Sequence, residues 1–356
     1  MNIGIDIKAF KNGSTGIARY LRNIMDQLQK LDSANTYNLF ECTASDYKIT
    51  NRRWKKVLIP WKLPGIFWQQ LLLPFALKKH AIDILWAPEQ ICPVWYSGTV
   101  FTTVHDLTAL RYPASCQKTN YFIQKYLFPL TIKRSKLLLP VSDFIGREVL
   151  QWYPELATPQ MITTVTNGSP DWKFHPHPQD ADTDPYLFFA GNLEPRKNLI
   201  RLIEALEILQ SRGITLPLHL AGPPGWKNSE IHRKIEQSPV GSSISFLGYL
   251  SEDELEKQYR NSAAVIYPSL YEGFGLPVLE ALSTGTRIIT SRATVMEEIA
   301  GPFAHYFNPN DSDDIARTIG SALKQPPPDH TCQEVLQRYT WEKSARKLLE
   351  LFITVR

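Results

Sequence analysis

The sequence predicts an α/β protein of two domains, each built on a parallel sheet covered by helices. The chain has 356 residues, which is more than one hydrophobic core usually serves. Short apolar runs alternate with amphipathic helical stretches, a pattern typical of parallel sheets with helices on both faces. A segment rich in proline and aspartate, residues 169–185, interrupts this alternation and is interpreted as the interdomain linker.

The expected strands are short runs rich in β-branched and aromatic residues. In the first half they cover residues 3–7, 37–41, 56–59, 83–86, 100–105, 136–141 and 162–166. In the second half they cover residues 186–190, 216–221, 244–247, 263–267, 287–290 and 305–307. An apolar stripe from Ile17 to Leu28 predicts the first helix, and residues 341–352 predict the last one. His175 and His177 have no third ligand nearby and are interpreted as solvated linker residues.

The composition is that of a soluble globular protein, with 43% hydrophobic and 21% charged residues. A net charge of only +4 argues against nucleic acid as a partner. The four cysteines are far apart, have no metal-ligand spacing and suit a reducing compartment. No apolar run is long enough for a secretion signal or a membrane span. We therefore expect a cytoplasmic protein.

The most informative stretch is SLYEGFGLPVLEA, residues 269–281. Its proline suits the start of a helix, so Glu272 should lie in a loop and Glu280 about one turn into that helix. The two glycines allow close approach to a ligand, and exposed amides at a helix start can bind an anion. Carboxylates accept hydrogen bonds from hydroxyls. A ligand with both phosphate and sugar hydroxyls would satisfy this set; the alternative is a surface loop with two solvated glutamates.

A second stretch, GNLEPRKN over residues 191–198, follows an expected strand and precedes an amphipathic helix. Arg196 and Lys197 can neutralise a diphosphate, and the helix start adds its dipole. Asn198 is the expected N-cap. The alternative interpretation is a pair of solvated cations in front of a helix.

Together these two stretches resemble the signatures of family 4 glycosyltransferases, which are retaining enzymes with the GT-B fold. The resemblance spans nearly the whole chain. It implies two Rossmann-like domains facing a deep interdomain cleft. Residues 1–170 would form the acceptor-side domain, with a C-terminal helix at about 340–356 packing back on it. Residues 171–339 would bind the nucleotide-sugar donor.

The resemblance also implies roles for single residues. Arg196 and Lys197 would hold the leaving diphosphate, Glu280 the ribose hydroxyls, and Glu272 the sugar. The implied donor-binding residues are Gly16, Gly191, Arg196, Lys197, Gly273, Phe274, Gly275, Leu276 and Glu280. The implied catalytic residues are His105, Arg196, Lys197 and Glu272.

In the first half, Gly16 opens the first helix, where family members turn a glycine toward the donor phosphates. His105 ends an expected strand, a position at which many members have a His-Asp pair. Asp106 would either orient His105 or cap the next turn. Ser142 and Asn167 resemble further donor-side positions of lower specificity, although Ser169 replaces the apolar residue that family members commonly have there.

The implied activity is transfer of a hexosyl group, glucose or mannose, from UDP-glucose or GDP-mannose to a sugar hydroxyl of a polysaccharide or glycolipid. A deoxyhexose donor such as dTDP-rhamnose is a further alternative. Neither a metal nor a cofactor is expected, because cations and helix ends would hold the leaving group. Two other functions stay open: a nucleotide-sugar epimerase of the same fold, and an inactive carbohydrate-binding subunit.

One basic and aromatic region, residues 52–79, carries seven cations and no acid. Trp54, Trp61 and Trp68 recur within it at intervals of seven residues. Basic and aromatic groups together suit an anionic membrane surface or a lipid-linked glycan acceptor. This predicts peripheral contact with the inner face of the plasma membrane, with the tryptophans at the headgroup level. The alternative is a buried strand and helix with an exposed basic rim.

Overall fold

The computed structural model describes residues 1–12, 15–62, 64–172, 185–225, 228–326 and 332–354. The chain divides into two compact units, and each is described by itself. The first comprises Met1–Leu110, Lys118–Asn167 and Tyr339–Arg356, and the second Arg111–Gln117 and Gly168–Arg338. Most of the expected linker, including His175 and His177, lies outside the described residues.

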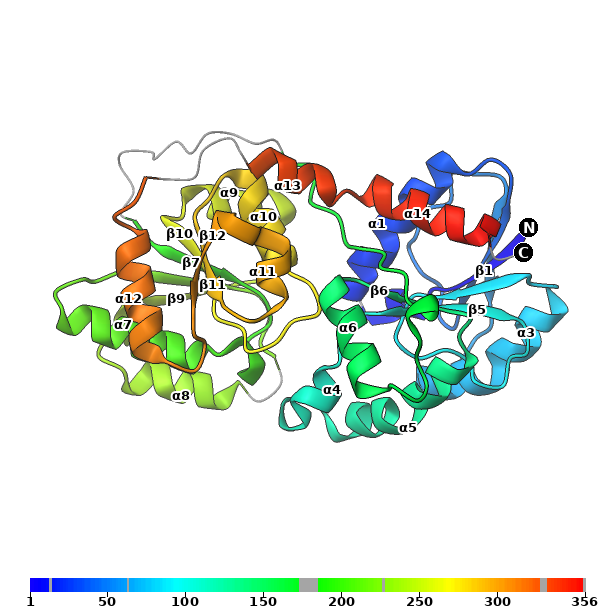
Figure 1. Ribbon diagram of the computed structural model, residues 1–356, viewed down its shortest axis with the longest axis horizontal. Coiled ribbons are helices and arrows are strands. Elements are labelled where there is room, and N and C mark those ends of the chain that lie inside the picture. The colour runs from blue at the N-terminus through cyan, green and yellow to red at the C-terminus, as the bar shows by residue number, and fades with distance from the viewer. Residues whose placement is uncertain (13–14, 63, 173–184, 226–227, 327–331, 355–356) are drawn as a thin grey trace. The chain divides into compact units, whose positions relative to one another are not determined.

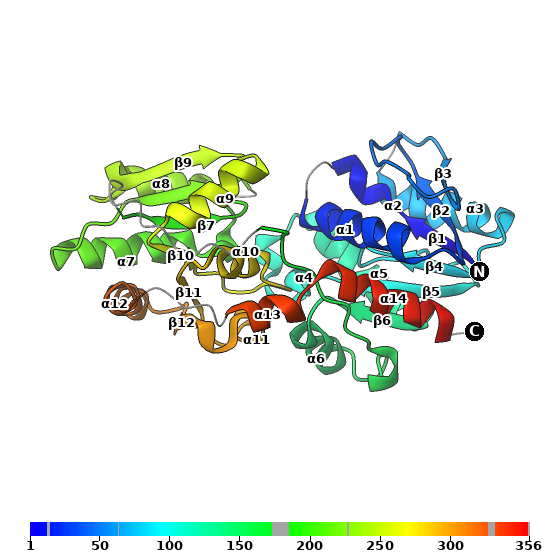
Figure 2. The same ribbon diagram turned by 90° about the horizontal axis from the view of Figure 1, so that it is seen from above.

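The first unit, which carries the labels β1, β5 and β6 in Figure 1, contains a parallel sheet of six strands in the order β3-β2-β1-β4-β5-β6 (Figure 2). Its strands are β1 (Asn2–Asp6), β2 (Thr36–Glu41), β3 (Trp54–Leu58), β4 (Ile84–Ala87), β5 (Thr99–Val104) and β6 (Leu137–Pro140). Its helical segments are η1 (Lys8–Asn12), α1 (Gly16–Leu31), α2 (Gly65–Phe67), η2 (Trp68–Leu72), α3 (Leu73–Lys79), α5 (Lys118–Arg134), α6 (Asp143–Trp152), η4 (Pro159–Met161) and α14 (Trp341–Thr354). The short helix α4 (Thr108–Arg111) crosses the division between the units.

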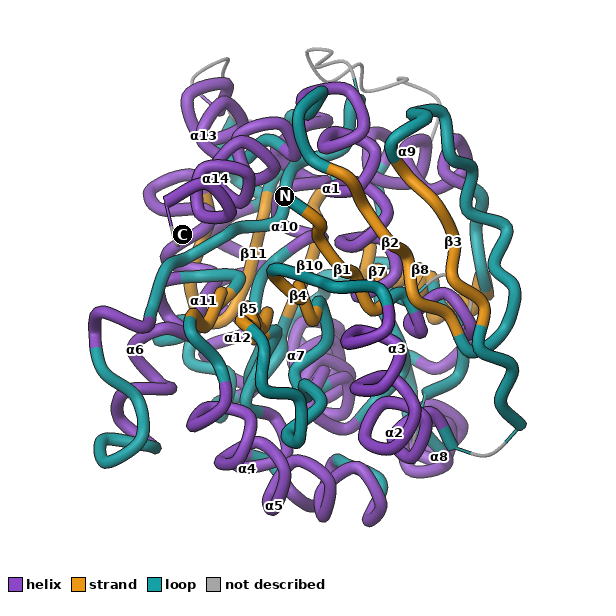
Figure 3. Tube along the Cα trace, turned by 90° about the vertical axis from the view of Figure 1, so that its right-hand side faces the viewer, coloured by secondary structure: helices purple, strands orange, loops and turns teal. Residues whose placement is uncertain are grey.

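Helices cover both faces of this sheet, which explains why its strands are apolar on both sides. On one face α14 packs against α1 (Figures 2 and 3), and Phe352 stacks on Phe101 with ring centroids 5.8 Å apart. On the other face lie η2, α3 and α5 (Figure 3). The side chains of Ile3 and Ile5, in β1, are fully buried between these layers.

The second unit contains another parallel sheet of six strands, in the order β12-β11-β10-β7-β8-β9. Its strands are β7 (Leu187–Ala190), β8 (Leu218–Ala221), β9 (Ile244–Gly248), β10 (Ala264–Tyr267), β11 (Ile288–Ser291) and β12 (Ala304–Phe307). Its helical segments are η3 (Pro113–Ser115), η5 (Pro195–Lys197), α7 (Leu199–Ser211), α8 (Ser229–Gln237), η6 (Gly241–Ser243), α9 (Glu252–Asn261), α10 (Leu276–Thr284), α11 (Val295–Ala300), η7 (Gly301–Phe303), α12 (Ser312–Ala322) and α13 (Gln333–Arg338).

Counted from the first strand of each unit, the two sheets have the same doubly wound order. The order reverses between β1 and β4 in the first sheet and between β7 and β10 in the second. Ligands of such sheets bind beyond the carboxyl ends of the strands at this switch point. The predicted α/β class with two Rossmann-like parallel sheets is confirmed, and the residues after β1, β4, β7 and β10 become the first places to look for chemistry.

One expected strand is wrong. Residues 162–166 run beside β6, and the amides of Thr163 and Val165 donate to its carbonyls at 3.0 and 2.9 Å. The pairing is limited to a single bridge between Leu138 and Ile162, so no ladder forms. The apolar pattern of this segment reflects burial beside the sheet rather than membership of it.

Two tryptophans of residues 52–79 are buried, so the expectation that they lie at a membrane surface is wrong for both. Trp54 is 4% exposed and stacks on Tyr37 with ring centroids 4.2 Å apart. Trp68 is fully buried, and its Nε1 donates to a backbone carbonyl at 3.0 Å. Trp61 is half-buried and packs against the hydrophobic cluster that contains Trp68. Among the described residues, no helix is both long and apolar enough to cross a membrane.

Candidate active site

The two signature stretches meet at the switch point of the second sheet. Arg196 and Lys197 lie in η5, just after β7, and Glu272 lies in the loop between β10 and α10. The amide of Leu270 donates to the carbonyl of Arg196 at 2.9 Å and joins the two loops directly. The strand order of this sheet therefore brings together residues that are about 75 positions apart in the chain.

Asn198 ties these loops together, which differs from the predicted N-cap role. Its backbone has a positive φ of 61°, and its side chain makes no cap to α7. Instead its Nδ2 donates to the carbonyls of Pro268 and Pro309 at 3.1 and 2.7 Å. Its Oδ1 accepts from the side chain of Arg201 at 3.0 Å rather than from a backbone amide of α7, so side-chain and tertiary contacts replace the local cap.

The centre of this site is one carboxylate shared by two cations. Glu272 Oε2 lies 2.7 Å from Arg196 Nη1, and its Oε1 lies 2.6 Å from Lys197 Nζ. All three side chains are largely buried, with 12%, 19% and 6% of their surfaces exposed for Glu272, Arg196 and Lys197. At the edge, Arg196 Nε pairs with Glu194 at 3.1 Å, while Lys197 donates to the hydroxyl of Tyr267 at 2.5 Å.

The pKa values of this cluster follow from burial and from the unequal number of charges. Burial alone would raise the pKa of Glu272, but Arg196 and Lys197 outweigh it and lower the pKa to about 2. Burial and the neighbouring Arg196 cation lower the pKa of Lys197 to about 8, although Glu272 acts in the opposite direction. The carboxylate is therefore ionised throughout the physiological range, whereas the lysine loses its proton slightly above neutrality.

Gly191 lies against the same lysine. Its φ is +153°, and a Cβ added there would lie 3.7 Å from Lys197 Nζ. Gly222 approaches even more closely, since its added Cβ would meet the carbonyl of Gly191 at 2.2 Å. Glycine is therefore favoured at both positions: at Gly191 because of its positive φ, and at Gly222 because a side chain would clash with the backbone of the turn after β7.

Gly273, Phe274 and Gly275 are buried, and Leu276 begins α10. A Cβ added to Gly275 would lie 2.8 Å from the sulfur of Met296, so any larger residue there would have to displace that side chain. Glu280 lies in α10 as expected; it is 3% exposed and accepts a hydrogen bond from the hydroxyl of Tyr259 at 2.6 Å.

The remaining sequence-predicted residues belong to the first unit. His105 follows β5, and its Nε2 lies 2.7 Å from the carbonyl oxygen of Pro88. Asp106 caps the next turn by accepting from the amide of Thr108 at 2.8 Å, which is the second of its two predicted roles. Gly16 is the first residue of α1, and a Cβ there would meet nothing within 4 Å.

The two predicted positions of lower specificity, Ser142 and Asn167, are both buried. The hydroxyl of Ser142 is fully buried and accepts from the amide of Ile145 at 3.2 Å, so it caps α6. Asn167 is 5% exposed and is the last residue of its segment of the first unit.

Sequence reasoning missed several partners in these sites. Tyr267 and Tyr259 contact Lys197 and Glu280 but belong to no motif. A tyrosine at the carboxyl end of an expected strand, next to a signature stretch, was the available signal for Tyr267. In the part of the chain that the structure describes, no group of three or more His, Cys, Asp or Glu side chains could hold a metal ion.

Comparison with known proteins gives a family match for the second half of the chain and relatives over most of its length. Residues 171–340 match the family described as Glycosyl transferases group 1. The chain is 26% identical to O-antigen chain mannosyltransferase B of Escherichia coli, over 99% of each chain. It is 26% identical to the serotype-specific mannosyltransferase WbdA of Escherichia coli over 98% of this chain but only 46% of that one, so it spans about half of WbdA. It is also 25% identical to O-antigen chain mannosyltransferase RfbU of Salmonella typhimurium, over 77% of this chain and 73% of RfbU.

Among solved structures, sucrose-phosphate synthase from Thermosynechococcus elongatus superposes with a TM-score of 0.81 at 15% identity, covering 100% of this chain and 99% of that one. Anabaena Alr3699/HepE, in complex with UDP and glucose, superposes with a TM-score of 0.74 at 16% identity, covering 99% and 100%. At these identities the similarity establishes a common fold.

Proposed function

The chain is a glycosyltransferase with a glycosyl transferases group 1 domain on a GT-B fold, and from this premise we propose that it transfers a mannosyl group. The donor is a nucleoside-diphosphate mannose, with GDP-mannose as the leading candidate. The acceptor is a sugar hydroxyl of a growing O-antigen-type polysaccharide, and the anomeric configuration is retained. The choice of mannose over glucose is supported by two relatives that align over most of both chains and are mannosyltransferases by name.

The arrangement that carries the proposal is the Arg196–Lys197–Glu272 cluster at the switch point of the second sheet. Two cations share one carboxylate there, so a diphosphate can replace Glu272 as the counter-ion of one or both. Charge-assisted contacts of this kind stabilise the negative charge that grows on a departing diphosphate. The absence of a side chain at Gly191 keeps a Cβ from lying 3.7 Å from Lys197 Nζ, which favours binding of a phosphate there.

The other residues complete the proposed site. Glu272, once released from the cations, would bind the sugar together with the turn over residues 273–276. Glu280 would contact the ribose, Gly16 the phosphates and His105 a sugar hydroxyl. The leaving diphosphate would take the proton of the acceptor hydroxyl as the sugar departs from the same face, which accounts for retention without a protein nucleophile.

A thermal-shift panel of GDP, UDP, dTDP and ADP tests the donor. A ligand present at a hundred times its dissociation constant stabilises the native state by about 2.7 kcal/mol, so one base should raise the melting temperature well above the others. GDP is expected to be that base. Incubation with GDP-mannose and a mannan oligosaccharide should then give an α-linked product. Stabilisation by UDP alone would contradict GDP-mannose as the donor. Conversion of the donor to its epimer would show an epimerase instead of a transferase.

We further propose that the first unit contacts an anionic membrane surface through side chains other than the tryptophans. Phe67, Leu71 and Phe75 recur every four residues along α2, η2 and α3, and are 51%, 52% and 75% exposed. The exposed Lys78 and Lys79 end this helical stretch. A similar stripe runs along α5, where the exposed residues are Phe122, Tyr126 and Leu130. Apolar side chains beside lysines suit an interface of headgroups and acyl chains.

Liposome co-sedimentation tests this contact. Binding should rise with anionic lipid and fall with salt, and the double change Phe67→Ser and Phe75→Ser should reduce it at least about tenfold, because each phenyl transfers apolar area from water. Tyr249→Ser removes an equally exposed aromatic, 71% exposed, from the second unit and should have no effect. Wild-type protein that ignores anionic liposomes at low salt would rule the contact out.

A further inference from the structure

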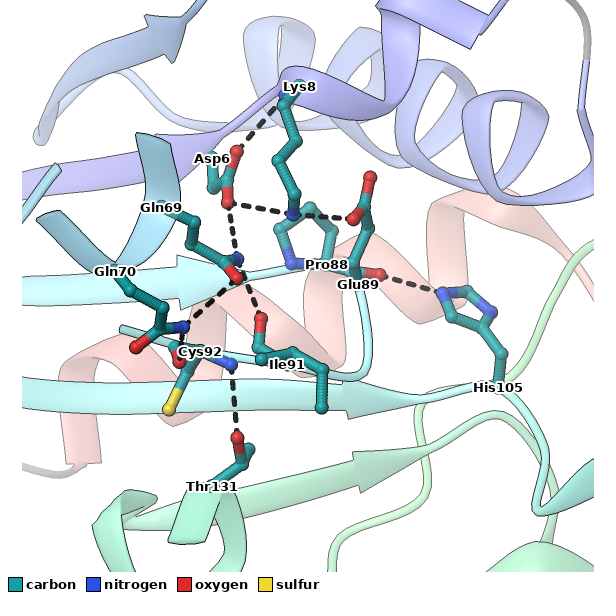
Figure 4. Close-up of polar contacts among 10 residues, drawn as sticks. All are labelled: Asp6, Lys8, Gln69, Gln70, Pro88, Glu89, Ile91, Cys92, His105 and Thr131. Atoms are coloured by element: carbon teal, nitrogen blue, oxygen red, sulfur yellow. Dashed lines mark hydrogen bonds and ion pairs between the residues drawn. The ribbon is translucent and has the colours of Figure 1, made fainter. Parts of the chain in front are cut away.

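The switch point of the first sheet carries a charge cluster that the proposed reaction does not use (Figure 4). Lys8, two residues beyond the end of β1, places its Nζ 3.2 Å from Asp6 Oδ2 and 2.5 Å from Glu89 Oε2. The side chain of Asp6 is fully buried, and those of Lys8 and Glu89 are 11% and 24% exposed. Burial alone would lower the pKa of Lys8, but the two carboxylates outweigh it and raise the pKa, so the lysine stays charged.

Two glutamines extend this cluster to the segment that follows β4. Gln69 Nε2 donates both to Asp6 Oδ2 at 2.8 Å and to the carbonyl of Ile91 at 2.7 Å. Gln70 Nε2 donates to the carbonyl of Cys92 at 2.8 Å, and Gln70 Oε1 accepts from the amide of Val94 at 3.0 Å. Both glutamines belong to η2, which is a π-helical turn, and such turns are frequently found at functional sites. The segment 88–94 is therefore held in two ways. Lys8 pairs with the side chain of Glu89, and the two glutamines bond to the backbone of Ile91, Cys92 and Val94.

This segment presents the carbonyl of Pro88 to His105, with 2.7 Å between the oxygen and Nε2 (Figure 4). A carbonyl oxygen only accepts hydrogen bonds, so Nε2 must carry a hydrogen. In a neutral imidazole the other nitrogen, Nδ1, is then an acceptor. Burial lowers the pKa of His105, against smaller effects of Pro88 and Asp106, so the ring is neutral at physiological pH. The groups around the ring are Asp106, the Tyr20 ring at 5.1 Å, and the segment carrying Glu89.

We propose that Lys8, Gln69 and Glu89 are positioning residues that keep His105 in the tautomer protonated at Nε2, so that Nδ1 accepts a hydrogen bond from a sugar hydroxyl. The identity of that ligand rests on the proposed function, whereas the tautomer does not. Without the held carbonyl, the ring could exchange tautomers and would present a donor and an acceptor in turn. A fixed acceptor instead recognises a hydroxyl only as a donor, which orients its oxygen lone pairs away from His105.

The test is long-range proton–nitrogen NMR of the full chain labelled at histidine, with His105 assigned by its loss in His105→Gln. In wild type, Nδ1 should show the shift of a bare nitrogen and Nε2 that of a protonated one. Lys8→Met should give averaged shifts and lower the pKa of His105 by at least about half a unit, because the Pro88 carbonyl that favours the protonated ring is no longer held in place. The acid limb of kcat/KM should move with it, and kcat/KM should fall about tenfold. Lys8→Arg should restore both.

The matched control is Lys234→Met, which removes a lysine paired with Glu207 at 2.9 Å in the second unit. It should leave the tautomer and titration of His105 unchanged. Should Lys8→Met not fold, Gln69→Leu carries the same test, because it leaves the ion pairs in place. Unchanged His105 shifts and titration in a folded variant would overturn the positioning role, whatever happens to turnover. If the shifts change as expected while wild-type protein transfers no sugar, the proposed function fails and the positioning role stands.

Discussion

The switch points of the two sheets carry charge clusters of similar design but different charge balance. Both sheets have the same strand order, and in both a lysine just after the first strand pairs with a glutamate that follows the fourth. In the first unit Lys8 stands between Asp6 and Glu89, so one cation faces two carboxylates. In the second unit Glu272 stands between two cations, and the edge residue Glu194 brings that group only to neutrality.

The difference in balance explains what each cluster can do. The anionic cluster raises the pKa of Lys8 and satisfies its only cation internally, so it suits a structural or positioning role. In the second cluster, burial and the Arg196 cation outweigh the nearby carboxylates and lower the pKa of Lys197 to about 8. Such a cation gains from an incoming anion. The same fold can therefore place either a structural ion-pair cluster or an anion-binding site at one topological position.

The largest expected effect comes from removing a cation of the second cluster. Arg196→Ala or Lys197→Ala should lower kcat/KM at least about a hundredfold, because each removes a charge-assisted contact to the departing diphosphate. Steady-state kinetics with purified variants measures this, and thermal unfolding checks that they fold. Arg212→Ala, which removes an exposed pair with Asp313 in the same unit, is the control and should retain near-native activity. Near-native turnover in both alanine variants would show that the second cluster is not the diphosphate site, and the functional contrast between the two clusters would be lost.

The next effect is on the pH dependence. Lys197 has a lowered pKa of about 8, so it is charged below that value and loses its charge as the pH rises through it. The kcat/KM of the donor should therefore fall above about pH 8, approaching tenfold for each further pH unit. Lys197→Arg keeps the charge at all these values and should lose this limb. An alkaline limb that persists in Lys197→Arg would belong to another group.

Local patterns were enough to predict much of this molecule, because they report on single elements. Alternating runs predict each strand through its own burial, and a Gly-x-Gly turn before a proline predicts a helix start wherever it lies. Asn198 shows the limit, since its side chain satisfies carbonyls from two distant loops rather than its own helix. Lys8, Gln69 and Glu89 were missed for the same reason. They lie up to 81 positions apart, and only the order of the strands brings them together.

A smaller effect separates the two glutamates of the signature stretch. Glu280→Gln should weaken donor binding about tenfold, the value of one hydrogen bond to a charged group, with little change in kcat. Glu272→Gln should lower kcat more than it weakens binding, if the glutamate contacts the sugar more strongly as the sugar leaves. Because Glu272 supports the charge of Lys197, its loss should also move the alkaline limb below pH 8.

Calorimetric donor titrations together with steady-state kinetics distinguish these outcomes. Equal losses of binding in both variants, with kcat unchanged in each, would show that the two carboxylates share one role.

The smallest expected effect is that of a chelator, for which we predict no change in activity. A metal-dependent transferase needs carboxylates free to bind Mg²⁺ or Mn²⁺ next to the diphosphate. Here the carboxylates of both switch points already pair with lysine or arginine, and in the second cluster the cations themselves can neutralise the leaving group. Activity should therefore be the same after exhaustive dialysis against EDTA and after addition of Mn²⁺. A loss that Mn²⁺ restores would mean that a metal, and not Arg196 and Lys197 at the second switch point, neutralises the diphosphate.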